Sequence, residues 1–196
     1  MRAALITDQQ AEHTQRAYAR FAGFMYLFIL LCFVAAQLIL SGISGNGAFV
    51  DTAHRIADSQ LLYRVGLFCY VVGSLATIPL VVALYTTLKP IDTTLALMAV
   101  LFRVVETAFD GLWIVGHFAV LQLAVAATQA NAFDATQLGA LADLTVGARE
   151  VGFALSAGVS TVGSSIFFYL FLKSRYIPRI LAVWGIFGAV WFTAVG

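Results

Sequence analysis

Four ionisable side chains occupy one short segment of an otherwise apolar stretch of the chain: Arg103, Glu106, Asp110 and His117. At 100° of rotation per residue, their spacing places all four within an arc of about 80° on one face of a helix, and Trp113 shares that arc. Carboxylates, a guanidinium and an imidazole on one face could bind an ion, move a proton or hold a polar solute. We call these five residues the polar stripe.

The polar stripe lies in a chain with the composition of a membrane protein. Of its 196 residues, 61% are hydrophobic and 11% are charged, and the mean hydropathy is +0.92. A soluble domain has about twice that share of charged residues. The net charge of +1 says nothing about nucleic acid, and no basic cluster suggests a nucleic-acid partner, so membrane lipids are the expected partners.

Apolar runs of about 20 residues predict an all-α, polytopic membrane helix bundle that forms a single transmembrane domain over residues 1–196. Two longer connections, 44–61 and 128–143, contain amphipathic segments, which predict short interfacial helices on the outer face. The first apolar run is too long for a cleaved leader and resembles a retained signal anchor. The five expected transmembrane helices are 20–43, 62–88, 94–127, 144–172 and 177–196.

The basic residues favour a cytoplasmic N-terminus, because seven of them fall on one side of the predicted membrane and three on the other. The larger group is Arg2, Arg16, Arg20, Lys89, Lys173, Arg175 and Arg179. The smaller group is Arg55, Arg64 and Arg149.

An internal repeat appears when the chain is shifted by 85 positions. Twelve residues of 24–73 are then identical to their counterparts in 109–158. This predicts two parallel two-helix repeats, at about 20–88 and 94–172, plus a fifth helix at 177–196. The matched polar pairs are Gln37 and Gln122, Asn46 and Asn131, Asp58 and Asp143, and Arg64 and Arg149. The two aspartates could cap the helices that return across the membrane.

The polar stripe is not repeated, because its counterparts in the first copy carry no charge. Those counterparts are Tyr18, Phe21, Met25, Phe28 and Cys32. Three charges facing lipid would cost on the order of 8 kcal/mol, so the stripe must face protein or water. Counting depth along each span predicts an outward-opening polar cavity between the repeats, with Asp110 as its floor. The other side chains expected around it are Gln37, Arg64, His117, Gln122, Arg149 and Glu150.

Several interpretations of the stripe remain open at this point. It could be a buried ion-pair network that only fixes the register of the helices. It could instead bind a solute, an ion or a proton, with Asp110 and His117 as a titrating pair and Arg103 and Glu106 as an inner latch. A metal held by His117, Asp110 and Glu150 is a further alternative. The flanking Gly116 and Phe118 also leave room for a flat tetrapyrrole ligated by His117, although this single histidine does not lead us to predict a cofactor.

Short motifs along most of the chain resemble a bacterial family of small multi-pass membrane proteins catalogued as domain of unknown function 4386. They are Arg20 with Ala22 and Gly23, then IPLVVALYTTLKPI at 78–91, FRVVE at 102–106 and IPR at 177–179. The resemblance implies a location in the bacterial cytoplasmic membrane and directs attention to Arg103 and Glu106. It implies no activity, and members of the family often continue beyond the point where this chain stops.

The leading hypothesis is a non-enzymatic membrane protein that binds or moves a small polar solute, ion or proton. No catalytic residue is predicted. The second hypothesis is a structural or assembly subunit of a larger membrane complex, with a homo-oligomer or another membrane protein as partner. An intramembrane enzyme is the third.

Overall fold

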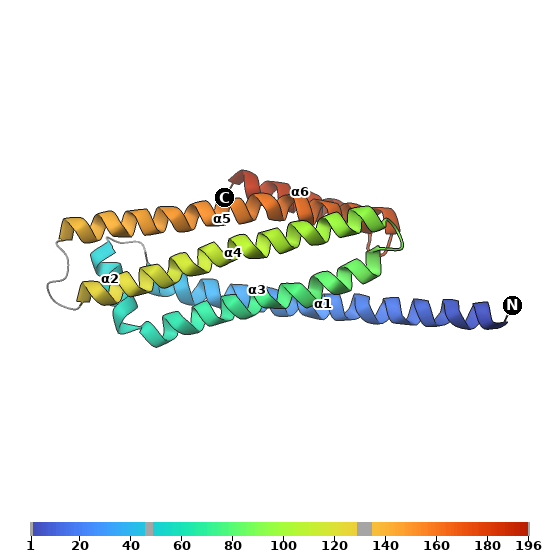
Figure 1. The fold of residues 1–196 in the computed structure, drawn as a ribbon, viewed down its shortest axis with the longest axis horizontal. Helices are drawn as coiled ribbons and strands as arrows, with labels where there is room; N and C mark the ends of the chain where they lie inside the picture. The colour runs from blue at the N-terminus through green and yellow to red at the C-terminus, as the bar shows by residue number, and fades with distance from the viewer. Residues whose placement is uncertain (1, 46–48, 129–134, 196) are drawn as a thin grey trace. The chain divides into compact units, whose positions relative to one another are not determined.

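The computed structural model describes residues 2–45, 49–128 and 135–195, and every element in these ranges is an α-helix (Figure 1). In chain order the helices are α1 (Arg2–Ser44), α2 (Phe49–Asp58), α3 (Gln60–Leu88), α4 (Thr93–Thr128), α5 (Ala135–Ser174) and α6 (Arg179–Val195).

Four of these helices contain segments long and apolar enough to cross a membrane. The segments are Gln15–Ser44, Gln60–Leu88, Thr93–Thr128 and Gly139–Ser174. Inside lipid a helix satisfies its own backbone N–H and C=O groups, which is why such apolar sequences fold this way. The predicted helical membrane bundle is confirmed at this level. The fifth expected span corresponds to α6, whose apolar part, Arg179–Trp191, is shorter.

Side chains and special backbone angles mark the helix ends. Gly45 follows α1 with a φ of 59°, and its N–H donates to the Ser41 carbonyl at 3.0 Å. Glycine adopts this left-handed conformation without strain. Asp92 caps α4 by accepting a hydrogen bond from the Leu95 N–H at 3.0 Å, and its other oxygen lies 3.5 Å from Lys173 Nζ. This backbone hydrogen bond lowers the pKa of Asp92 below its ordinary value.

The amphipathic segment of the first connection forms α2, as predicted. Ala53 and Ile56 are buried on its inner face, whereas Asp51, His54 and Arg55 are exposed. The second connection differs from the prediction, because residues from Ala135 onward belong to one continuous helix, α5. Asp143 therefore lies inside α5 and Asp58 ends α2, so neither aspartate caps a returning helix. Asn46 and Asn131 lie outside the described residues.

The chain divides into two compact units, and α1, α3, α4 and α5 each contribute to both. Unit 1 comprises Met1–Phe28, Ala76–Thr107 and Ala157–Gly196, and its buried core is Leu88, Ala96, Ala99, Phe167 and Leu170. Unit 2 comprises Ile29–Leu75 and Ala108–Ser156. Its core joins α1 through α4 at Leu40, Ile43, Ala53, Ile56, Tyr63, Leu67, Val120, Leu121 and Ala124.

Candidate functional site: a polar cavity beside His117

The polar stripe of α4 faces protein, as predicted from the free-energy cost of exposing its charged side chains to lipid. His117 is 4% exposed, and the other four stripe residues are partly buried. Other faces of the same helix carry exposed apolar side chains such as Val104, Leu112 and Val115, which suit contact with lipid. The stripe is divided between the two units, with Arg103 and Glu106 in unit 1 and the remaining three residues in unit 2.

In unit 1, Arg103 and Glu106 form a close ion pair. Arg103 Nη1 donates to both carboxylate oxygens, at 2.8 and 2.9 Å, and Nη2 donates to Ser164 Oγ on α5 at 2.8 Å. Gly163 brings α5 close at this level, because a Cβ there would lie 2.9 Å from Phe102 Cβ. The pair thus links two helices, and for this half of the stripe the geometry supports the structural interpretation.

In unit 2, Asp110 and His117 have partners on different helices. Ser156 Oγ of α5 donates to Asp110 Oδ1 at 2.6 Å, whereas the Tyr63 hydroxyl of α3 lies 2.7 Å from His117 Nδ1. Seven residues of helix separate Asp110 from His117, a rise of about 10 Å. They therefore do not share a hydrogen bond, and the predicted titrating pair has no direct contact.

His117 is held between aromatic rings. Its ring centroid lies 4.0 Å from that of Trp113, which is 4.2 Å from Tyr70, and Tyr70 stacks on Phe33 at 4.8 Å. These contacts and the Tyr63 hydrogen bond fix the orientation of the imidazole. Among the described residues, His117 Nε2 has no protein partner.

Two glycines bring α4 and α5 together next to His117. A Cβ on Gly116 would lie 2.8 Å from Arg149 Cβ, and one on Gly152 would lie 3.2 Å from Leu112 Cβ. Small residues at such crossings let membrane helices approach closely. The contact at Gly116 places Arg149 directly beside the imidazole. It also fills the space in which the sequence suggested a tetrapyrrole.

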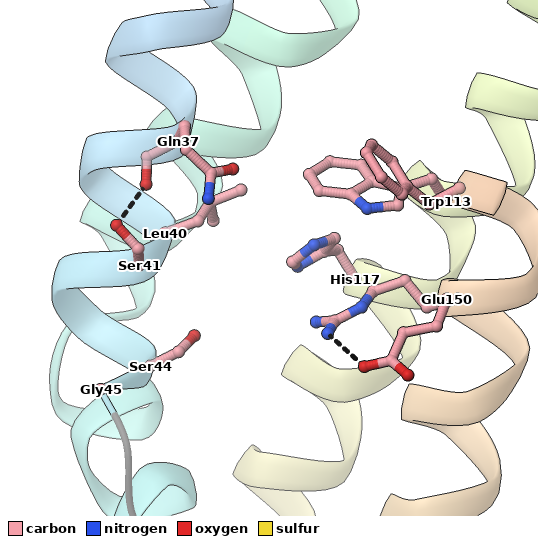
Figure 2. A pocket seen from close by; sticks show the side chains of 10 residues that line it. Gln37, Leu40, Ser41, Ser44, Gly45, Trp113, His117 and Glu150 are labelled. Atoms are coloured by element: carbon pink, nitrogen blue, oxygen red, sulfur yellow. Dashed lines mark hydrogen bonds and ion pairs between the residues drawn. The ribbon is translucent and has the colours of Figure 1, made fainter. Parts of the chain in front are cut away.

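A cavity of about 360 Å³ opens beside His117 within unit 2. Figure 2 shows Gln37 and Ser41 of α1 on one side and Trp113, His117 and Glu150 on the other. The closest Arg149–Glu150 contact is 3.8 Å, and the Glu150 side chain is 69% exposed. The complete lining is Gln37, Leu40, Ser41, Ser44, Gly45, Trp113, His117, Arg149, Glu150 and Phe153.

The cavity collects four of the predicted site residues: Gln37, His117, Arg149 and Glu150. Gln122 is exposed and does not line it. Arg64, also exposed, borders a separate, mainly apolar depression with Val65, Phe68, Val71 and Phe118. Asp110, Arg103 and Glu106 are not among the lining residues either.

Part of this lining was not predicted from the sequence. Gln37, Ser41 and Ser44 recur at intervals of four and three residues, which places them on one face of α1, and this spacing could have revealed them. Tyr63 carried no comparable signal. Its role depends on a contact with a residue 54 positions away.

The described part of the chain gives no support to the metal alternative. Within it, no three histidine, cysteine, aspartate or glutamate side chains lie close enough together to hold a metal ion. Asp110, His117 and Glu150 therefore do not form a ligand set.

Comparison with known proteins agrees with the resemblance seen in the sequence. The model of a family described as "Domain of unknown function (DUF4386)" matches residues 21–195. The chain belongs to this family. No curated protein and no solved structure matches the chain. Every residue that lines the cavity falls inside the range matched by DUF4386, so the cavity is part of the family domain.

Proposed function

We propose that this membrane protein binds a small polar solute, ion or proton in the cavity beside His117, and that binding is the first step in moving this ligand across the membrane. The observation that carries the proposal is the environment of His117. His117 is 4% exposed, lines the cavity, and presents an Nε2 atom that has no protein partner among the described residues. No fully buried side-chain N or O atom of the described residues lacks a partner, so Nε2 is reachable from the cavity, where a ligand or water would satisfy it.

The arrangement of charge supports binding at this place. In unit 1 Arg103 and Glu106 bind each other closely, whereas Arg149 and Glu150 are 3.8 Å apart, beyond the usual length of a charge-assisted hydrogen bond. The cavity also takes its walls from α1 in the first predicted repeat and from α4 and α5 in the second. A site between two repeats is the usual arrangement in transporters built from repeats.

Filling the cavity tests the proposal. Purified protein in lipid nanodiscs would be heated with butyrate, butyramide or butylammonium, which differ in charge but are similar in size. We expect at least one probe to raise the unfolding temperature saturably, and Ser41→Phe to abolish the effect because its ring fills the cavity. Leu38→Phe adds a ring to an exposed position on the same helix and should keep the effect. Equal responses in both variants, or no response to any probe, would contradict binding in this cavity.

The proposal includes an arrangement in the bacterial cytoplasmic membrane, with α6 as a fifth span, two parallel repeats and a cytoplasmic N-terminus. Single cysteines placed at Asp51 and Pro90, after Cys32 and Cys69 are changed to alanine, would test the orientation. A membrane-impermeant maleimide added to intact cells should label position 51 and leave position 90 unlabelled. The reverse pattern would overturn the proposed orientation.

A further inference from the structure

The cavity beside His117 is lined by N–H groups that have no protein acceptor. Among the described residues, the indole of Trp113 and the side-chain amide of Gln37 make no hydrogen bond to protein, and the closest acidic oxygen to Arg149 is 3.8 Å away. A guanidinium offers up to five donors in a planar fork. The lining therefore offers more donors than its own acceptors satisfy.

We infer that the cavity recognises the carboxylate of a small organic anion, with Arg149 as the charged donor and His117 Nε2–H and Trp113 Nε1–H as neutral donors. This inference rests on the proposed function and specifies its ligand. In this assignment the Tyr63 hydroxyl is the donor of its 2.7 Å hydrogen bond to His117 Nδ1, because Tyr63 is fully buried and this bond satisfies its proton. The neutral imidazole then carries its own proton on Nε2, the atom left for the ligand.

The balance of charge in the cavity favours an anion. The Arg149 side chain is 23% exposed, whereas that of Glu150 is 69% exposed. Solvent screens the exposed carboxylate more strongly than the guanidinium, so the cation dominates inside the cavity. Arginine also binds carboxylates through two parallel hydrogen bonds, which lysine cannot form.

One feature of α1 could oppose an anion, because its C-terminal carbonyl groups carry partial negative charge. The structure neutralises this end. The Ser44 carbonyl accepts hydrogen bonds from Thr52 Oγ1 at 3.0 Å and from Arg55 Nη2 at 2.9 Å, and the Ser41 carbonyl accepts one from the Gly45 N–H. These donors leave the end of α1 compatible with a carboxylate.

The size and apolar part of the lining indicate an organic ligand. The cavity of about 360 Å³ is within the range of small-molecule sites, and Leu40 and Phe153 contribute apolar surface. A carboxylate with a short hydrocarbon tail would satisfy the donors and cover this surface. Inorganic anions would leave the apolar part uncovered.

Fluorescence of Trp113 provides a direct assay. Changing the exposed Trp184 and Trp191 of α6 to phenylalanine leaves Trp113 as the sole tryptophan. Its emission would be titrated in phosphatidylcholine nanodiscs at pH 7 with butyrate, butyramide and butylammonium. We expect a saturable response to butyrate, and an affinity at least tenfold lower for the other two. An equal or stronger response to butyramide or butylammonium would overturn the carboxylate assignment but leave the proposed function intact. If none of the three probes changes the fluorescence, both the assignment and the proposed function are overturned.

Variants of Arg149 test the assigned donor. Arg149→Gln should weaken butyrate binding at least tenfold, and Arg149→Lys should weaken it about three- to tenfold because the charge stays and the fork is lost. Arg64→Gln removes the same charge from the matched position of the first predicted repeat, which is outside the cavity, and should change the affinity less than twofold. Circular dichroism would verify that each variant folds. If Arg149→Gln does not fold, the butyrate affinity of Arg149→Lys is the test of Arg149 as the donor. Unchanged butyrate affinity in the folded variant overturns the inference.

The phosphate of a phospholipid is also an anion with oxygen acceptors, so the experiment must test whether a lipid headgroup occupies the cavity. The butyrate titration would be repeated in nanodiscs that contain phosphatidylglycerol. An affinity within twofold of that in phosphatidylcholine supports a soluble carboxylate as the ligand. Loss of the butyrate response in the anionic lipid would overturn this assignment in favour of a lipid headgroup.

Discussion

Replacing Gly116 by alanine should force α4 and α5 apart at the wall of the cavity. An added Cβ would lie 2.8 Å from Arg149 Cβ, 3.1 Å from Arg149 Cγ and 3.3 Å from Arg149 Cα. Carbon atoms in contact prefer a separation of about 3.5–4.0 Å. Two of the three neighbours belong to the rigid start of the side chain or to the backbone, so changing the Arg149 rotamer cannot remove the overlap.

The expected loss of stability follows from comparing Gly116 with Gly111, a second glycine of α4. A Cβ on Gly111 meets nothing within 4 Å. Alanine favours a helix by about 1 kcal/mol over glycine at either position, so this contribution cancels between the variants. The remaining difference is the cost of overpacking, which is typically about 1–3 kcal/mol. We therefore expect Gly116→Ala to be less stable than Gly111→Ala by that amount.

Reversible unfolding in mixed micelles at increasing mole fractions of sodium dodecyl sulfate would measure the difference. The Gly116→Ala variant should also lose affinity for any ligand that contacts Arg149, whereas Gly111→Ala should keep it. If the two variants unfold at the same detergent fraction, the close approach of α4 and α5 at Gly116 is refuted. The placement of Arg149 beside His117 would then lose its support.

Three further substitutions have defined outcomes. Arg103→Ala removes the close partner of the partly buried Glu106 and should destabilise the fold by about 2–4 kcal/mol, and adding Glu106→Met should recover most of the loss in the same unfolding assay. Tyr63→Phe keeps the ring but removes the hydrogen bond to His117, so we expect a loss of about 1 kcal/mol and altered imidazole ¹⁵N chemical shifts that report the tautomer. Asp92 has a lowered pKa in the folded protein, so its contribution to stability is complete above the ordinary value near 3.8 and declines as the pH falls through the folded pKa. Unfolding temperatures of the wild type should therefore fall more steeply below pH 4 than those of Asp92→Asn, and parallel pH profiles would contradict this.

The inward orientation of the polar stripe was predictable because the cost of charge in lipid leaves no alternative for Arg103, Glu106 and Asp110. Gln122 was expected beside the cavity because depth in the membrane was counted without direction around the helix. Five residues separate His117 from Gln122, a rotation of about 140°, so the glutamine faces away from the cavity. Neighbouring helical residues also point about 100° apart, so Tyr63 and Arg64 cannot both face the cavity. In the structure Tyr63 is buried and Arg64 is exposed.

Other parts of the site depend on contacts that no local pattern encodes. Gly116 was interpreted as open space, although the structure fills that space with Arg149 from α5. Likewise, the amphipathic pattern of 128–143 did not distinguish a separate interfacial helix from the first turns of a longer one. The described part of this segment, from Ala135, joins α5 because a helix extends readily where no proline interrupts its hydrogen bonds.

The stacked rings of Phe33, Tyr70 and Trp113 have an optical consequence. The ring centroids of Tyr70 on α3 and Trp113 on α4 are 4.2 Å apart, their planes are inclined by 27°, and Phe33 of α1 stacks on Tyr70, so both chromophores are held in a chiral setting. Two chromophores this close couple their electronic transitions, so the folded protein should have a strong circular dichroism band in the near ultraviolet. Melting of the ring stack would abolish this band while the helical signal in the far ultraviolet persists, which would let a spectrometer follow side-chain order in unit 2 separately from helix content.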